Sequence, residues 1–491
     1  MWKMEKHIRG IICGVFFIGM SIQIAMGLIW ALAHFTVIPG YPESSIYVEI
    51  SKSFLADEYT GILYPVILML ARGVAGILPL RYYSLMYLVQ LTVACYASHR
   101  FLRSCRVVSR ERGTGSVFWD IWCTLCLMTI PMAMQCHMAV LPHSLTLSFF
   151  MVMISFVLEA ADIPEVLQAR TLMKMTPLWL AASLLMPEYK YLAAVPILGL
   201  FLLNSVCLWK KDRRQIIRHG LVILAFVGMI AGLGSLTQVP GSQGKMRKSL
   251  AGSMVSRFVW PDFQKNYPAW PEEIQNVMTR NDAAEISMYS EGVQTLFGPL
   301  IETAVGADRA KELYWEMVRA AGSFRLREVA VNSLWDAACY AASPWMLELQ
   351  LAGMGYESYS GRNYEIMSDR HPALTVPYLR YGNRWFCAGI LLALFSWLGS
   401  VAGWCIRCRH GKGQSGSGKR QVGGPCRMIV FPVLAGAAMV VYYTLSGAGI
   451  MDYKNSLFIT VLWYAWMLRE ATKRERRMRG GADADMRKLG Q

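Results

Sequence analysis

The chain has 491 residues, of which 54% are hydrophobic and 17% are charged, and it carries a formal net charge of +16. This charge content is low for a soluble protein, and the apolar residues recur in runs of about 20, the length that crosses a bilayer as a helix. The composition therefore argues against an ordinary water-soluble protein and predicts an all-α polytopic membrane protein with about ten transmembrane helices.

The predicted spans, in chain order, are residues 8–34, 80–102, 117–136, 139–160, 176–187, 190–209, 219–236, 385–406, 428–447 and 456–469. The first span has a basic start and carries Ala31-Leu32-Ala33 near its end, as a cleaved signal peptide would. Its apolar run from Gly10 to Trp30 is longer than the apolar region of most signal peptides. We therefore favour a retained helix over a cleaved leader.

The basic residues predict the topology. Twenty-nine of the 49 lysines and arginines lie in segments 1–10, 100–116, 161–175, 209–219, 406–427 and 469–491, which alternate correctly to share one side. Basic loops face the cytoplasm, so the sequence predicts a multi-pass protein of the cell membrane with both termini cytoplasmic. Because these residues lie in short loops and a tail beside membrane helices, the positive charge argues against a nucleic-acid partner.

Three domains follow from this pattern. Residues 1–236 form an N-terminal transmembrane domain, residues 237–384 an extracytoplasmic domain, and residues 385–491 the last helices with a basic cytoplasmic loop and tail. The middle domain is close to neutral and is predicted to be mostly helical, with apolar residues at helical spacing from Gly298 to Gly353. Its tryptophans and tyrosines fit either sugar or acceptor binding or an ordinary small core.

The first outer loop, residues 35–60, is acidic, with four carboxylates and one lysine. The apolar residues Ile46, Tyr47, Ile50 and Phe54 fall at helical spacing, which predicts a helix lying on the membrane surface from Glu43 to Phe54. A second surface helix is predicted over residues 61–79, where Arg72 interrupts an apolar run and faces a polar cavity or the interface. The alternative interpretation is a surface loop whose carboxylates are merely hydrated.

Glu43, Tyr47-Val48-Glu49-Ile50, Asp57-Glu58 and Leu63-Tyr64-Pro65 resemble the first outer loop of the C-type (GT-C) membrane glycosyltransferases, the group of the lipid A aminoarabinose transferase and the protein O-mannosyltransferases. The resemblance implies that the first acid, Glu43, is the catalytic base and that the donor is a sugar on a polyprenyl phosphate. Two departures are clear: Ser44 replaces the second acid, and Tyr64-Pro65-Val66 has a single proline. Asp57 is the alternative base.

The predicted site follows from this reading. A carboxylate must take the proton of the acceptor hydroxyl, and cations must stabilise the departing phosphate. The candidates are Glu43, Asp57 and Glu58 for catalysis, and Tyr47, Glu49, Arg72, Arg81, Lys190 and Lys454 for binding the substrate and its phosphate. Each cation has an alternative role as a residue that contacts lipid headgroups.

No motif predicts a metal or another cofactor, and a divalent cation is left open. Cys405 and Cys408, near His410 and Cys426, are interpreted as reduced cytoplasmic thiols, and the GQSGSGKR stretch at 413–420 as a flexible linker. His137 and His143 flank another outer turn and are interpreted as structural.

The sequence thus predicts a glycosyltransferase that moves a sugar from a polyprenyl-phosphate donor to a glycan or lipid acceptor of the cell envelope, with membrane lipids as further partners. The alternative is a transporter or flippase of a lipid-linked or amphipathic substrate, which would place ionisable residues or broken helices near mid-membrane. The predicted spans are nearly free of charge, which favours the enzyme.

Overall fold

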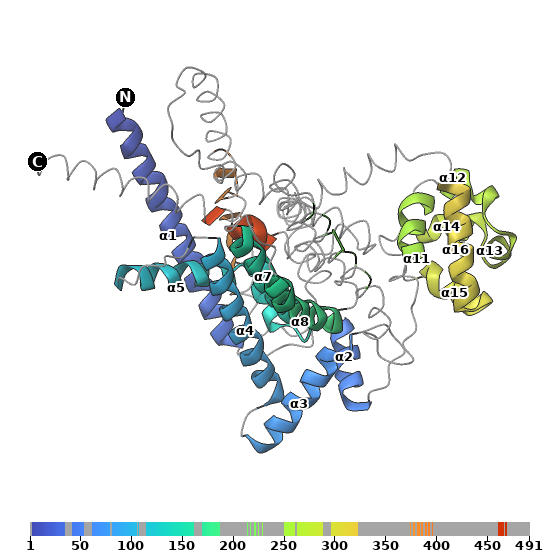
Figure 1. The fold of residues 1–491 in the computed structure, drawn as a ribbon, viewed down its shortest axis with the longest axis horizontal. Helices are drawn as coiled ribbons and strands as arrows, with labels where there is room; N and C mark the ends of the chain where they lie inside the picture. The colour runs from blue at the N-terminus through green and yellow to red at the C-terminus, as the bar shows by residue number, and fades with distance from the viewer. Residues whose placement is uncertain are drawn as a thin grey trace, which may run out of the picture.

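The computed structural model describes residues 2–34, 42–53, 61–78, 81–105, 107, 114–161, 169–186, 250–260, 263–287, 296–322, 460–465, 467 and 468, together with isolated positions between 214 and 228 and between 374 and 395. The regular elements of these residues are all helical, which confirms the predicted all-α class. Figure 1 shows two groups of helices, α1 to α8 and α11 to α16.

The N-terminal group consists of α1 (Trp2–His34), α2 (Pro42–Ser53), α3 (Leu63–Ile77), α4 (Tyr82–Ser104), α5 (Thr114–Met128), α6 (Pro131–Met138), α7 (His143–Ala161) and α8 (Ala169–Leu185). Helix α4 contacts α3, α5, α6 and α7, and α7 packs in turn against α8. One hydrophobic cluster runs through this group, because each helix turns one apolar face toward its neighbours. The predicted helices at 8–34, 80–102, 139–160 and 176–187 correspond to α1, α4, α7 and α8.

Among the described residues, one segment is both long and apolar enough to cross a membrane, Gly14–Ala33 of α1. Leu63–Ile77, Val117–Met128 and His143–Phe156 are apolar but shorter. Helix α1 also presents a stripe of exposed large apolar side chains, formed by Val15, Ile18, Ile22, Ile29 and Leu32. The predicted spans at 190–209 and 428–447 lie outside the described residues, and those at 219–236 and 385–406 lie largely outside them; of the span at 456–469, residues 460–465, 467 and 468 are described.

The predicted span over 117–136 is not one continuous helix. Helix α5 ends at Met128 and α6 begins at Pro131. The residue before a proline is driven out of the helical region, and Ile130 has φ −58° and ψ 127°. The carbonyl of Thr129 accepts hydrogen bonds from Gln23 Nε2 at 3.2 Å and from the Tyr378 hydroxyl at 2.6 Å. Side chains of distant segments thus satisfy the backbone at the break.

The end of α1 is packed into the protein rather than left exposed. Trp30 and Ala31 are 1% and 7% exposed, and the Trp30 ring lies 5.6 Å from that of Tyr378. The hydroxyl of Tyr87 donates to the Ala31 carbonyl at 3.2 Å. These contacts place the C-terminal end of α1 in the hydrophobic cluster of the N-terminal group.

The second group forms around a hydrophobic cluster of its own. It consists of α11 (Leu250–Met254), the π-helical turn η3 (Val255–Val259), α12 (Phe263–Asn266), the 3-10 turn η5 (Tyr267–Ala269), α13 (Glu272–Val277), α14 (Arg280–Ser287), α15 (Gly298–Val305) and α16 (Ala307–Gly322). Trp260, Trp270 and Phe297 lie within 4.9 to 6.1 Å of one another, as ring centroids, at its centre. Between α15 and α16, Gly306 has φ +85°, a conformation that glycine adopts without strain.

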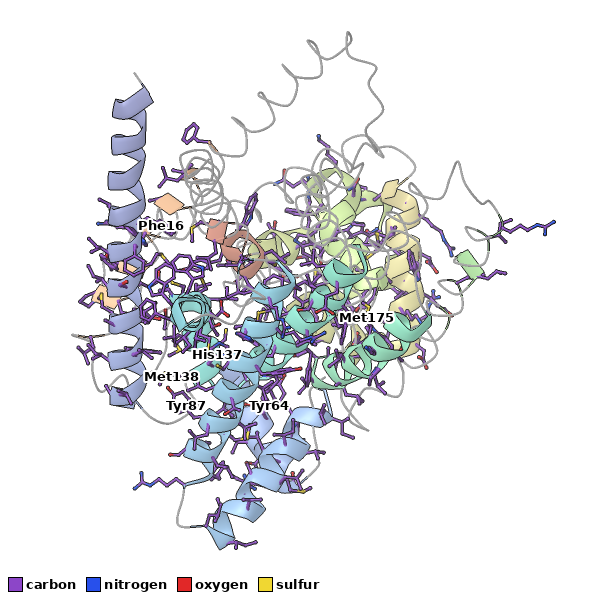
Figure 2. All side chains as sticks on the ribbon, turned by 60° about the vertical axis from the view of Figure 1, so that its left-hand side comes forward. Phe16, Tyr64, Tyr87, His137, Met138 and Met175 are labelled. Atoms are coloured by element: carbon purple, nitrogen blue, oxygen red, sulfur yellow. The ribbon has the colours of Figure 1, made fainter. Side chains whose placement is uncertain are left out.

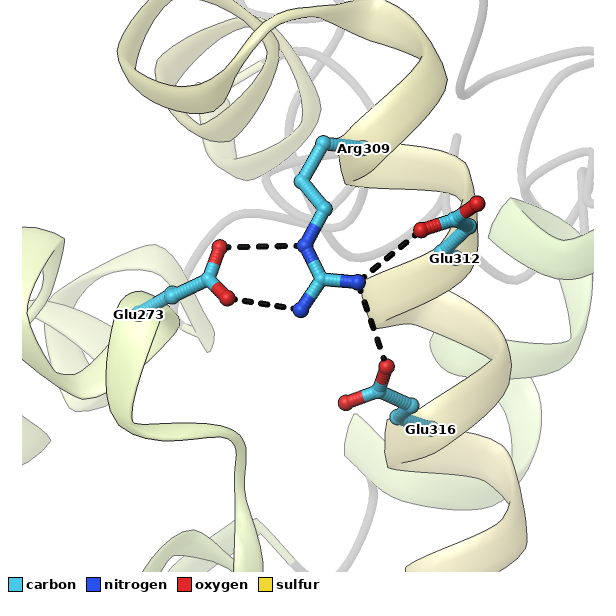
Figure 3. A network of polar contacts seen from close by, with 4 residues as sticks. All are labelled: Glu273, Arg309, Glu312 and Glu316. Carbon is cyan, nitrogen blue, oxygen red and sulfur yellow. Dashed lines mark hydrogen bonds and ion pairs between the residues drawn. The ribbon is translucent and has the colours of Figure 1, made fainter.

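One arginine connects two helices of this group, α13 and α16, at its surface. Arg309 of α16 makes two hydrogen bonds to Glu273 of α13, at 2.6 and 3.2 Å, and also contacts Glu312 and Glu316 (Figure 3). The hydrogen bonds from Arg309 hold the pKa of Glu273 below its ordinary value of 4.5. Because the folded pKa is the lower one, Glu273 stabilises this unit at neutral pH, and that contribution is lost as the pH falls below 4.5 and through the lower pKa of the folded state.

We therefore expect the stability of the 250–322 region to fall less with decreasing pH in Arg309→Gln than in the wild type. The wild-type chain should lose resistance to protease in the 250–322 region as the pH drops below 4.5, and the variant should lose less. Both side chains are exposed, so water and salt weaken the pair, and the difference should shrink in high salt. Peptide-resolved proteolysis across a pH series measures this, with Arg319→Gln on the same helix as the control. Equal acid dependence in the wild type and Arg309→Gln would contradict the prediction.

Candidate functional site

Helices α2 and α3, which follow α1 and precede α4 in the chain, pack against each other, and α3 also packs against α4. We call them the α2–α3 pair. The inner face of α2 carries Ser44, Tyr47 and Ile50, which are 0%, 8% and 1% exposed. The Tyr47 ring meets the edge of Tyr64 on α3, with centroids 5.3 Å apart. The predicted amphipathic helix from Glu43 to Phe54 is therefore present, and its inner face packs against α3.

Glu43, the predicted base, lies in the first turn of α2. It stands four residues before Tyr47, so the two positions share one face of the helix. Glu49 lies on the other side, where it is 66% exposed and pairs with Lys52 at 3.1 Å. Glu49 therefore points into the surroundings, whereas the backbone of α2 places position 43 on the same side of the helix as Tyr47.

Ser44 was not predicted as a site residue, although its position was recognised as a departure from the family pattern. Its hydroxyl oxygen is buried and has no hydrogen-bond partner among the described residues. A buried hydroxyl without a partner costs free energy, so this position favours an incoming donor or acceptor. The only signal in the sequence was the substitution of a serine for an acid next to Glu43.

Arg72 is engaged by α2 itself. Its guanidinium donates to the Ser51 hydroxyl at 3.0 Å and to the Ser51 carbonyl at 3.4 Å, and it lies 5.2 Å from the centre of the Tyr82 ring. Ser51 is eight residues beyond Glu43, about 12 Å along the helix axis. The arginine therefore fixes the C-terminal end of α2 at a distance from the predicted base. Arg81 is exposed at the position just before α4.

A buried polar network, which the sequence did not predict, connects α3 to its neighbouring helices. The Tyr64 hydroxyl donates to Gln90 Oε1 at 2.9 Å, and Gln90 Nε2 donates to the carbonyls of His137 and Ala139 at 2.6 and 3.2 Å. His137 Nδ1 shares a hydrogen bond of 2.7 Å with the Ser144 hydroxyl. Figure 2 labels Tyr64 and His137 within this part of the molecule. The network connects the α2–α3 pair to α4, α6 and α7 and makes its position rigid.

The remaining predicted residues, Asp57, Glu58, Lys190 and Lys454, lie outside the described residues. Within the described ranges, no group of three or more histidine, cysteine or acidic side chains is placed to hold a metal ion. The described residues therefore place position 43 in the first turn of α2, next to the buried hydroxyl of Ser44 and the packed rings of Tyr47 and Tyr64. Such a set can accept a proton from a hydroxyl group bound next to α2.

Comparisons of the chain with protein-family models, with curated proteins and with solved structures find no match.

Proposed function

We propose that the chain is a polytopic membrane glycosyltransferase of the GT-C type, with about ten transmembrane helices and both termini in the cytoplasm. It transfers a sugar from a polyprenyl-phosphate donor to a glycan or lipid acceptor of the cell envelope. Glu43 is the base in this proposal, with Asp57 as the alternative and Glu58 beside it. The transfer takes place on the outer face of the membrane, at the α2–α3 pair.

The outward-facing apolar side chains support a membrane location. Besides the stripe on α1, Met69, Leu70, Val74 and Ile77 of α3 and Val117, Phe118 and Ile121 of α5 are exposed. Apolar patches of this kind on several helices are unfavourable in water and suit contact with lipid. Because α3 is too short to cross a bilayer, we place it along the membrane surface.

The observation that carries the proposal is the position of Glu43. It lies in the first turn of a short amphipathic helix that follows α1, next to the buried hydroxyl of Ser44, which has no hydrogen-bond partner among the described residues. A carboxylate there can accept a proton from an acceptor hydroxyl while a lipid-linked donor approaches from the membrane plane. The departing phosphate requires cations, for which Arg81, Lys190 and Lys454 are the candidates, with Arg72 holding α2 in place.

A transporter or flippase is the second candidate, and the break between α5 and α6 favours it, since broken helices form substrate sites in many transporters. However, the carbonyl of Thr129 at this break is buried and already accepts hydrogen bonds from the side chains of Gln23 and Tyr378. The break is therefore satisfied from within the protein, as expected of a structural kink. This comparison favours the transferase.

The test is to delete the protein from the organism that encodes it and to measure the envelope glycans and the lipid-linked sugars. The transferase proposal expects the loss of one surface sugar together with accumulation of its polyprenyl-phosphate donor on the outer leaflet. A transporter would instead leave the lipid-linked substrate on the inner leaflet, where added outer-leaflet probes cannot reach it. Unchanged glycans and unchanged lipid-linked sugars would overturn both.

A further inference from the structure

Helices α4, α7 and α8 line an open pocket of about 580 Å³ that the proposed function does not use. Its described lining consists of Val93, Tyr96, Arg100, Ser148, Phe149, Val152, Phe156, Lys174, Pro177 and Leu178. This volume is typical of sites for small organic ligands or for part of a lipid. Apart from one serine and two cations, the lining is apolar and aromatic, so a ligand for this pocket must be mostly apolar.

The two cations lie together over one aromatic ring. The Arg100 guanidinium carbon is 4.5 Å from the centre of the Phe156 ring, and Lys174 Nζ is 5.8 Å from the same centre. Arg100 also donates to Glu159 at 3.1 Å. Within the described residues, this is the only hydrogen bond of the Arg100 side chain, and no carboxylate pairs with Lys174. Among the described residues, this end of the pocket therefore holds two positive charges against one negative charge.

The apolar part of the lining leads away from these charges along all three helices. Val93 precedes Arg100 by two turns of α4, and Phe149 precedes Phe156 by two turns of α7, about 10 Å in each case. Arg100 lies near the C-terminal end of α4 and Lys174 near the N-terminal end of α8, and both contact the ring of Phe156 on α7, so the two cations lie at one level. In the predicted topology that level is the cytoplasmic side, beside the basic segment 100–116.

We propose that this pocket binds one anionic phospholipid from the cytoplasmic leaflet, with its phosphate at Arg100 and Lys174 and an acyl chain along Val93 and Phe149. The charge balance favours an anion, because the excess positive charge at a membrane interface lacks a protein partner among the described residues. The apolar lining favours an attached hydrocarbon chain over a free phosphate. The inference depends on the proposed membrane location and is independent of sugar transfer.

The experiment uses the full chain in phosphatidylcholine nanodiscs with a minor fraction of phosphatidylglycerol, and native mass spectrometry counts the lipids that remain bound after detergent release. The wild type should retain one phosphatidylglycerol. Arg100→Gln and Lys174→Gln should each weaken retention about five-fold, the effect of one basic residue on an anionic lipid. Glu159→Gln should strengthen retention, because it removes the carboxylate that competes for Arg100.

Arg103→Gln is the matched control, since Arg103 lies on the same helix, is exposed, and does not line the pocket. It should retain phosphatidylglycerol like the wild type. Val93→Trp, which fills the pocket without changing its charge, should displace the lipid. Equal losses in Arg100→Gln and Arg103→Gln would show non-specific headgroup contact and overturn the proposal. Retention of phosphatidylcholine, of a polyprenyl phosphate or of inorganic phosphate in place of phosphatidylglycerol would also overturn it.

Discussion

Glu43→Gln is expected to lower sugar transfer by roughly 10²- to 10⁴-fold, the usual contribution of a positioned general base. Glutamine has nearly the same shape as glutamate but cannot take a proton, so the substitution removes the chemistry and keeps the volume. Glu43 lies in the first turn of α2, whose inner face is packed through Tyr47 and Ile50. We therefore expect the α2–α3 pair to remain folded. Transfer from a synthetic polyprenyl-phosphate sugar in proteoliposomes measures the effect.

Glu49→Gln is the control for this experiment. Glu49 is on the same helix, carries the same charge, and pairs with Lys52 on the exposed side of α2. Exposed ion pairs of this kind contribute little to stability, so this variant should transfer sugar at close to the wild-type rate. If Glu43→Gln stays active while Asp57→Asn loses activity, Asp57 is the base. If all three variants stay active, the α2–α3 pair is not the catalytic site.

The helices of the α2–α3 pair were predictable because their signal is local. Apolar residues at helical spacing placed α2 and α3 within two residues of their observed bounds. The start of α8 was predicted too late, at residue 176 rather than Ala169, because the basic residues Arg170 and Lys174 reduce the hydropathy of its first turns. The break at Ile130 was readable from Pro131 but was outweighed by the apolar run on both sides.

The polar contacts were not predictable, because their partners are far apart in the sequence. Gln90 and Gln23 each occur singly in an apolar helix, and nothing nearby indicates what they bind. Gln90 contacts Tyr64 and the backbone of the α6–α7 turn, and Gln23 reaches Tyr464, 441 residues away. Likewise, the sequence shows that Arg72 is a cation beside apolar residues, but only the fold shows that its guanidinium donates a hydrogen bond to Ser51.

Gly61→Ala is expected to destabilise the chain by about 1 to 3 kcal/mol, the usual cost of adding a methyl group to a packed interior. Gly61 lies just before α3, and a Cβ atom there would overlap the carbonyl oxygens of Leu184 and Leu185 at the end of α8. These are backbone atoms, so they cannot move aside as a flexible side chain would. The substitution must push α3 away from α8, and with it the α2–α3 pair.

Gly73→Ala provides the matched control, because it makes the same chemical change within α3. Nothing lies within 4 Å of a Cβ atom at Gly73, and alanine favours a helix by about 1 kcal/mol over glycine. Relative to the wild type, the midpoint of thermal unfolding in nanodiscs should therefore be lower in Gly61→Ala and equal or higher in Gly73→Ala. Because α2 carries the proposed base and is packed on α3, Gly61→Ala should also lower transfer in the protein that remains folded. Equal midpoints in the two variants would mean that α3 does not rest on the end of α8, and the position of Glu43 would then lose its support.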